Sequence, residues 1–139
     1  MNDTGKALTM CDISHNTKHS DDGFQVIIYS KETGETPFLD YLLSLPPRMR
    51  AKVLKAIEIL KEKGIELREP YSSPIGYGLF ELRIRFGSDI VRCIYFFHKG
   101  RIVVLTNGFT KKTNKTPRGE IEKAKRYRTD WIRRNSNDI

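Results

Sequence analysis

GLFELRIRFGSDIVRCIYFFHKGRIVVLTNGFTKKTNKTP, the stretch from Gly78 to Pro117, decides the fold of this chain. Two short breaks, Gly87-Ser88 and Lys99-Gly100, divide it into three runs whose residues alternate with the period of a β-strand. Each break has the composition of a two-residue hairpin turn. The sequence therefore predicts three consecutive antiparallel strands, followed by a basic loop that runs into a helix.

The alternation predicts that these strands form a sheet with one apolar face and one charged face. If both turns are two residues long, Arg83 lies opposite Arg92, and Arg92 lies opposite Asn107. The same register places a continuous apolar set on the other face: Phe80, Leu82, Ile84, Val91, Cys93, Tyr95, Phe97, Ile102 and Val104. Arg92 is thus expected on the less apolar face, where its removal would leave the core intact.

Two arginines directly opposite each other need a counter-charge. Like charges in this arrangement destabilise a sheet by up to ~1 kcal/mol. Glu81 is an internal candidate to neutralise them, because it stands two residues before Arg83 on the same face. We interpret the charged face as a working surface for an anionic ligand, and the alternative is a salt-bridged sheet face without further function.

Composition favours one domain with a polyanionic partner. The chain has 139 residues and a net charge of +8. Residues 79–139 carry fifteen basic and six acidic side chains, a net charge of +9, so the excess lies on the three strands and the C-terminal segment. A basic half of this kind suits nucleic acid. The two cysteines and three histidines lack the spacing of a metal site, so neither a metal nor another cofactor is expected. The absence of a signal-like start and of a membrane-length apolar run favours a cytoplasmic protein without a membrane partner.

The rest of the chain divides into a tail and one domain. Residues 1–23 are polar and aperiodic, which predicts a flexible tail, and the domain spans residues 24–135. The expected elements before the last three strands are a strand from Phe24 to Tyr29, a helix from Pro37 to Ser44, a helix from Pro47 to Lys63, and a loop from Ile65 to Tyr77. Thr116 is expected to cap a last helix that starts at Pro117 and reaches about Arg134. The predicted order is β-α-α-β-β-β-α, an α+β fold.

Several segments of the chain resemble the RelE/HigB superfamily of type II toxins, in particular its phage-derived HigB-like branch. The resemblance is carried by GLFELR (Gly78–Arg83), Arg92, GFTKKTNKTP (Gly108–Pro117) and EIEKA (Glu120–Ala124). It implies a RelE-like α+β fold with a twisted antiparallel sheet packed against helices. It also implies a metal-independent endoribonuclease that cuts mRNA, usually in the ribosomal A site, and so inhibits translation. The implied partners are mRNA, the ribosome and a cognate antitoxin, often a helix-turn-helix protein, that holds the toxin inactive.

The resemblance also assigns roles to residues. Arg83 and Arg92 match sheet residues that contact the scissile phosphate, and Lys111 and Lys112 match the basic pair after the last strand, as further clamps or as the acid that protonates the leaving group. Glu81 is the carboxylate best placed to act as a base, or else it only pairs with Arg83. The further expected RNA contacts are Tyr77, Arg85, Asn107 and Lys115.

Two other functions share these features. A ParE-like relative would have the same fold but inhibit DNA gyrase without a nuclease site, and a non-catalytic module could bind nucleic acid with the same basic surface. The chain also departs from members of the superfamily that carry a catalytic Tyr or His shortly after the basic loop, because it has neither between Lys111 and Glu122. The identity of the general acid and base therefore stays open at this point.

Overall fold

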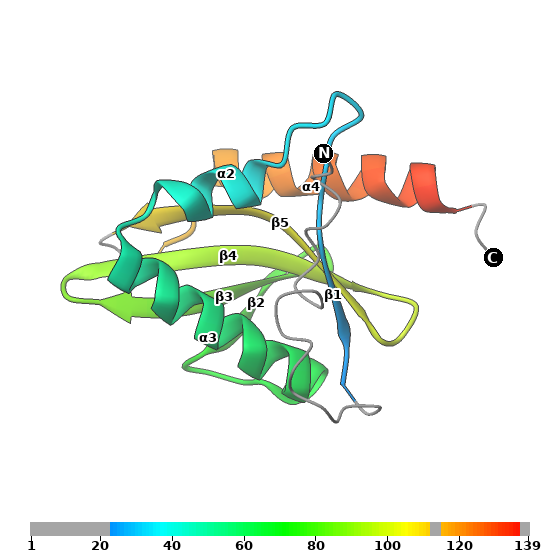
Figure 1. The fold of residues 1–139 in the computed structure, drawn as a ribbon. Coiled ribbons are helices and arrows are strands. Elements are labelled where there is room, and N and C mark those ends of the chain that lie inside the picture. The colour runs from blue at the N-terminus through cyan, green and yellow to red at the C-terminus, as the bar shows by residue number, and fades with distance from the viewer. Residues whose placement is uncertain (1–22, 112–114, 137–139) are drawn as a thin grey trace.

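A computed structural model describes residues 23–111 and 115–136. Within these residues it contains a five-stranded sheet and three α-helices, which confirms the predicted α+β class (Figure 1). In chain order the elements are β1 (Gln25–Ile28), α2 (Pro37–Ser44), α3 (Pro47–Lys63), the short 3-10 helix η3 (Gly64–Glu66), β2 (Ser72–Gly76), β3 (Leu79–Phe86), β4 (Asp89–His98), β5 (Ile102–Lys111) and α4 (Arg118–Asn135). None of the helices in these ranges is long and apolar enough to cross a membrane.

The sheet has the strand order β1-β5-β4-β3-β2, with one parallel pair. From β2 to β5, each strand pairs antiparallel with the next one in the chain. β1 pairs parallel with β5, so the sheet is mixed. β2 is a strand that the sequence did not predict, because Pro74 and Gly76 are typical of a loop. β2 lies at the edge of the sheet, which is where a strand tolerates proline.

The two hairpin turns differ from each other in length. The first has the predicted two residues, so Arg83 pairs with Arg92 as expected. The second has three residues, because His98 pairs with Ile102, and a bulge in β5 then leaves Thr106 without an opposite residue. Arg92 therefore lies opposite Phe109, and its predicted pairing with Asn107 is wrong.

The added turn residue also changes which side chains of β5 share a face. A shift of one residue exchanges the two faces of a strand. Ile102 and Val104, predicted to lie with the apolar set of β3 and β4, instead pack on the opposite face, and Val103 and Leu105 take their place. The bulge restores the original alternation, so Asn107 and Phe109 lie on the same face as Arg92.

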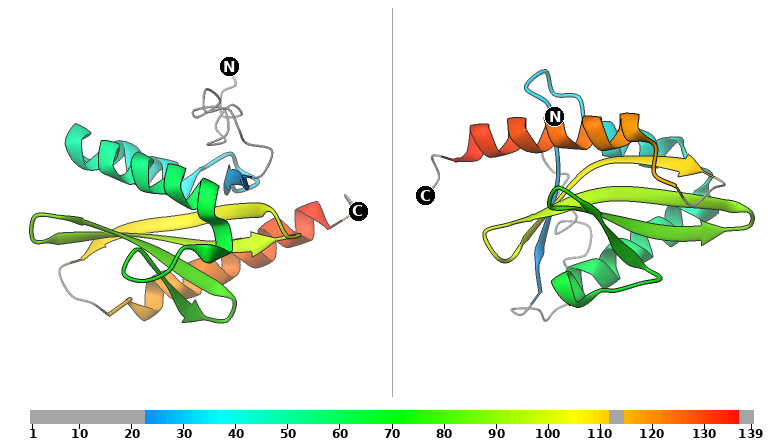
Figure 2. Two further views of the ribbon diagram at one scale, coloured as in Figure 1. Left: turned by 90° about the horizontal axis from the view of Figure 1, so that it is seen from below. Right: turned by 180° about the vertical axis from the view of Figure 1, so that it is seen from behind.

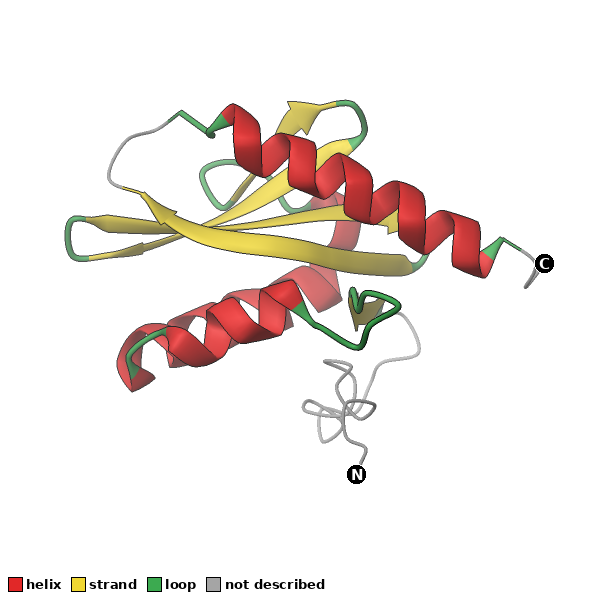
Figure 3. Cartoon of the chain, turned by 90° about the horizontal axis from the view of Figure 1, so that it is seen from above, coloured by secondary structure: helices red, strands yellow, loops and turns green. Residues whose placement is uncertain are grey.

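The sheet separates two helical layers, with α2 and α3 over one face and α4 over the other (Figures 2 and 3). The larger core lies between the sheet and α2 and α3, and its fully buried members include Phe38, Val53, Leu60, Cys93 and Val103. The smaller core lies under α4 and contains Tyr29, Leu79, Ile94, Phe96, Val104, Phe109, Ala124 and Trp131. The apolar side chains of α4, among them Ala124 and Trp131, thus pack on the sheet.

A polar network fastens the C-terminal half of α4 to the end of β1. The Tyr29 hydroxyl donates a hydrogen bond to Asp130 (2.6 Å), and Arg134 donates to the same carboxylate (2.7 Å). The Tyr29 ring stacks on Tyr127 with 4.8 Å between centroids. Burial, assisted by the bond to Asp130, raises the pKa of Tyr29 to about 12. The hydrogen bonds from Arg134 and Tyr29 hold the pKa of Asp130 well below its usual range.

These shifts predict how Tyr29→Phe changes the pH dependence of stability. A raised pKa contributes stability that is complete below the ordinary value of 10.0 and is lost as the pH rises towards about 12. Loss of the hydroxyl should lower the unfolding free energy at neutral pH by about 1 kcal/mol. The difference between the two proteins should then close as the pH rises from 10 towards 12, measured by urea denaturation. A difference that stays constant through this range would contradict the coupling of Tyr29 to Asp130. Tyr41 also has a raised pKa but is present in both proteins, so its effect cancels.

Candidate active site

The arginine pair of β3 and β4 lies on the face of the sheet that carries α4. Glu81 neutralises this pair as predicted: its Oε2 lies 3.1 Å from Arg92 Nη1 and 3.5 Å from Arg83 Nε. The two arginines differ in access, because the Arg83 side chain is 23% exposed and the Arg92 side chain is fully buried. Arg92 lies on the predicted face, opposite the apolar set, but it is covered there, so the expectation that its removal would leave the core intact is wrong. Arg83 is the member of the pair that reaches solvent.

Thr116 joins this buried ion pair from the end of the basic loop. Its hydroxyl donates to Glu81 Oε1 (2.6 Å) and accepts from Arg92 Nη1 (3.3 Å). The sequence predicted that Thr116 would cap the last helix, but α4 begins at Arg118 after an N-cap residue Pro117, and no side-chain cap bond is made there. Thr116 instead fixes the end of the basic loop against the sheet. Sequence reasoning did not assign it to the site, and its only signal was its position directly after the basic run.

Asn107 holds the first turn of α4 from a neighbouring position on β5. Its side-chain amide donates to the Glu120 backbone oxygen (3.2 Å) and to Glu120 Oε1 (3.0 Å). The residue is only 3% exposed, so in this conformation it faces α4 and not an open surface. Together with Thr116, it positions the segment in which the basic loop meets the helix.

The cations of β3, β4 and β5 stand in two adjacent rows of paired residues across the sheet. In the first row Arg83, Arg92 and Phe109 lie side by side, and in the second Arg85, Ile90 and Lys111 do so. Because neighbouring strands are about 4.8 Å apart, the backbones of Arg85 and Lys111 are separated by roughly 10 Å. Arg85 is exposed and Lys111 is half-buried. The two rows therefore bring the cations of β3 and β5 to one end of the sheet.

The basic loop adds a further charge at this end. Lys115 is exposed and directly precedes the anchored Thr116. Lys112, one of the predicted catalytic residues, lies outside the residues that the structure describes. Among the predicted site residues that are described, Glu81, Arg83, Arg85, Arg92, Lys111 and Lys115 thus belong to one end of the sheet or to the loop anchored there.

Tyr77 is not brought to this end. It occupies the turn between β2 and β3 with a φ of 61° and is 66% exposed. Lys125 Nζ lies 3.6 Å from the centre of its ring, and Arg128 donates a hydrogen bond to its backbone oxygen. Tyr77 precedes Arg83 by six positions, which corresponds to roughly 20 Å along a strand. An RNA contact at Tyr77 would therefore be separate from contact with the arginine pair.

A phenol that sequence reasoning missed lies next to the end of β5. The hydroxyl of Tyr41, on α2, lies 2.5 Å from Thr110 Oγ1, one residue before Lys111. Burial raises the pKa of Tyr41 to about 12, so the hydroxyl stays protonated at neutral pH. The signal in the sequence was Gly108, since a Cβ there would come within 2.6 Å of the Tyr41 ring. A glycine inside a strand often marks such a close approach.

The arrangement can bind a phosphate and stabilise charge on it. Arg83, Arg85, Lys111 and Lys115 offer accessible donors, while Glu81 is already engaged by two arginines and Thr116. No group of three or more His, Cys, Asp or Glu side chains that could hold a metal ion occurs in the described parts of the chain. The chemistry available to this surface is that of cations and proton donors.

The chain matches a family of phage-derived proteins over more than half of its length. The family model, described as Phage derived protein Gp49-like (DUF891), matches residues 40–129. The matched range includes every residue assigned to the candidate site. No curated protein sequence matches the chain.

Proposed function

The chain belongs to the family of phage-derived Gp49-like proteins, which is part of the RelE/HigB-like toxin superfamily, and from this we propose that it is a HigB-like type II toxin that cuts mRNA. Membership of this toxin-like family implies an antitoxin partner. The proposed activity is that of a metal-independent endoribonuclease, acting with the ribosome and thereby inhibiting translation.

The observation that carries the proposal is the pair of cationic rows beside an anchored basic loop. Cleavage of RNA without a metal requires the 2′-hydroxyl to attack the adjacent phosphorus while the 5′-oxygen leaves. Negative charge then develops on the phosphorane, and cations held in place stabilise it. Arg83 and Arg85 on β3 and Lys111 on β5 stand on either side of β4, and the RNA backbone is proposed to lie across them. Thr116 and Asn107 hold the junction between the basic loop and α4 against the sheet next to these rows.

The proposed role of each side chain follows from its exposure to solvent. Arg83 contacts the phosphate, and Lys111 or Lys112 protonates the leaving oxygen or adds a second clamp. Arg92 acts as a positioning residue, because it is buried and holds Glu81, which in turn holds Arg83. Glu81 has the same positioning role, and the three side chains that surround its carboxylate argue against its use as a free base.

Induction of the protein alone in a bacterium tests the proposal. We expect growth to stop and incorporation of labelled methionine to fall before incorporation of labelled thymidine. Primer extension on a highly expressed mRNA should show new 5′ ends at the same time. A fall in DNA synthesis that precedes the fall in translation would overturn the proposal in favour of a ParE-like gyrase inhibitor. Arrest without new 5′ ends would favour a non-catalytic binding protein.

A further inference from the structure

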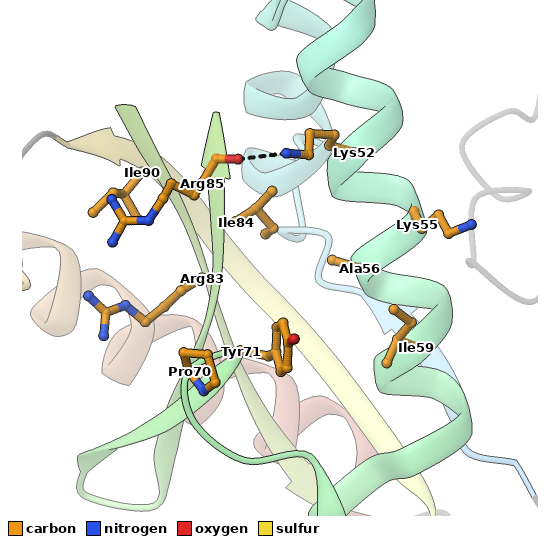
Figure 4. A pocket seen from close by; sticks show the side chains of 10 residues that line it. All are labelled: Lys52, Lys55, Ala56, Ile59, Pro70, Tyr71, Arg83, Ile84, Arg85 and Ile90. Carbon is orange, nitrogen blue, oxygen red and sulfur yellow. Dashed lines mark hydrogen bonds between the residues drawn. The ribbon is translucent and has the colours of Figure 1, made fainter. Parts of the chain in front are cut away.

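A pocket of about 410 Å³ opens between α3 and the outer edge of β3 (Figure 4). α3 and α4 lie on opposite faces of the sheet (Figure 2), so this pocket lies on the side away from α4, although Arg83 and Arg85 of the candidate site also line it. Its lining residues are Lys52, Lys55, Ala56, Ile59, Pro70, Tyr71, Arg83, Ile84, Arg85 and Ile90.

The walls of the pocket are mainly apolar. Ile59 on α3 and Tyr71 before β2 are large hydrophobic residues with 39% and 62% of their surface exposed. Figure 4 shows Ile84 directed from β3 towards α3, with the Tyr71 ring below it and Ile59 across the pocket. Apolar side chains gathered in a concave site are typical of a binding surface.

Beyond Leu82, no strand of residues 23–111 or 115–136 pairs with the outer edge of β3 at this pocket. β2 pairs with β3 only as far as Leu82, and the Arg83 amide then donates to the Tyr71 carbonyl (2.8 Å). Two residues further on, the outward carbonyl of Arg85 accepts from Lys52 Nζ (2.9 Å). Within the described residues, β3 therefore ends in an edge whose main chain faces the pocket. Such an edge is a template for an added strand.

The charged side chains differ between this pocket and the neighbouring depression along α3. The pocket is lined by Lys52, Lys55, Arg83 and Arg85 and by no acidic residue, although Figure 4 shows both guanidinium groups directed away from α3. Further along α3 the neighbouring depression includes Glu58 and Glu62. Figure 4 shows the Lys55 ammonium directed away from β3 as well, so the preference for carboxylates rests on Lys52, whose ammonium group also donates to the Arg85 carbonyl. The apolar walls and the strand edge favour a polypeptide over a nucleic acid.

We propose that this pocket receives an extended segment of the antitoxin, in which apolar side chains alternate with carboxylates, and that the segment pairs with the edge of β3 at Arg85. The inference rests on the proposed function for the existence of that partner and adds the place and chemistry of its docking. A segment bound here would lie beside the strand that carries Arg83 and Arg85. Its side chains would fill the space between Ile59, Tyr71 and Ile84.

A defined peptide tests the groove with the full-length protein. The probe is a soluble peptide of about six residues, the usual length of a strand, in which valine alternates with aspartate. Its binding is followed by amide chemical shifts in nuclear magnetic resonance spectra and by calorimetry. A matched peptide with lysine in place of aspartate and a short oligouridylate are the comparison probes. We expect the acidic peptide to shift the amides of Ile59, Ile84 and Arg85 in a saturable way, and the lysine peptide to leave them in place.

Three variants separate the walls of the pocket from its edge. Ile59→Asp places a charge on the apolar wall and should weaken binding at least about tenfold, as expected for the loss of a buried aliphatic contact. Arg85→Pro removes an outward amide without interrupting the pairing with β4 and should weaken binding similarly. Leu43→Asp is the matched control, because it changes an exposed leucine of α2 that does not line the pocket and should bind as the parent does.

The binding results test the inferred docking site independently of the proposed RNA cleavage. Absence of saturable shifts at millimolar peptide, equal binding of the lysine peptide, or equal binding by Ile59→Asp would overturn it. Stronger shifts of the same amides by oligouridylate would assign the pocket to RNA and would also overturn it. RNA cleavage by the same preparations is a distinct readout, and Ile59→Asp should retain it.

Discussion

Replacement of Lys111 and Lys112 together by alanine is expected to lower the single-turnover rate of RNA cleavage at least about a hundredfold. Removal of a proton donor or of a cation that stabilises the transition state typically costs ~10²–10⁴ in rate. Lys111 ends the row that begins at Arg85, so its ammonium group lies at the edge of the proposed phosphate site. Much of the loss should persist at saturating RNA or ribosomes, because in the proposed mechanism the lysines act on the chemical step.

A variant with the same loss of charge elsewhere provides the control. Lys63→Ala/Arg68→Ala removes two cations at and beyond the end of α3, away from the rows of the candidate site. It should weaken binding only slightly, and high substrate should restore the full rate. If the Lys111→Ala/Lys112→Ala protein also regains its full rate at high substrate, these lysines steer RNA and do no chemistry. The catalytic role would then move to Arg83 with Glu81.

Arg92→Ala is expected to destabilise the fold by about 3 kcal/mol or more, because removal of one partner leaves a buried carboxylate without its main counter-charge. This reverses the expectation drawn from sequence that the change would spare the core. Arg92 is fully buried and binds Glu81 through both carboxylate oxygens. A loss of this size is a large part of the stability of a small domain, typically about 5–15 kcal/mol. Urea denaturation followed by circular dichroism measures it.

The double variant Arg92→Met/Glu81→Met separates charge from packing. Replacement of a whole buried ion pair by apolar residues is often neutral or stabilising, so the double variant should recover much of the stability that Arg92→Ala loses. Its cleavage activity should stay low, since Arg83 then lacks the carboxylate that orients it. An Arg92→Ala protein with the midpoint and slope of the parent would show that the buried pair contributes little.

The parts of the fold that were predictable from sequence are those with a strong local signal. Pro37 and Pro47 begin helices at the predicted positions, and these helices end at Ser44 and Lys63 as expected. The turn at Gly87 fixed the register of the arginine pair correctly. β2 was not predicted, because Pro74 and Gly76 are typical of a loop, and this edge strand forms through its pairing with β3.

The site was less predictable, because it depends on contacts between distant segments. The predicted two-residue turn, Lys99-Gly100, and the observed three-residue turn, which adds Arg101, have nearly the same composition. No local sequence signal predicts the bulge at Thr106. The burial of Arg92 results from α4 and Thr116 closing over the sheet, which alternation along one strand does not encode. The neutralising role of Glu81 was predictable, since it needed only the period of β3.

The parallel pairing of β1 with β5 also determines how late in synthesis the sheet can be completed. β1 is synthesised first, but the strand beside it in the sheet is the last one made. Contacts this distant in sequence form late in folding, because the long connecting loop must first be closed. A chain still being translated therefore has neither a complete sheet nor the second row of cations until Lys111 has been added. Under the proposed function, unfinished chains would lack the activity, and an antitoxin would need to bind only completed molecules.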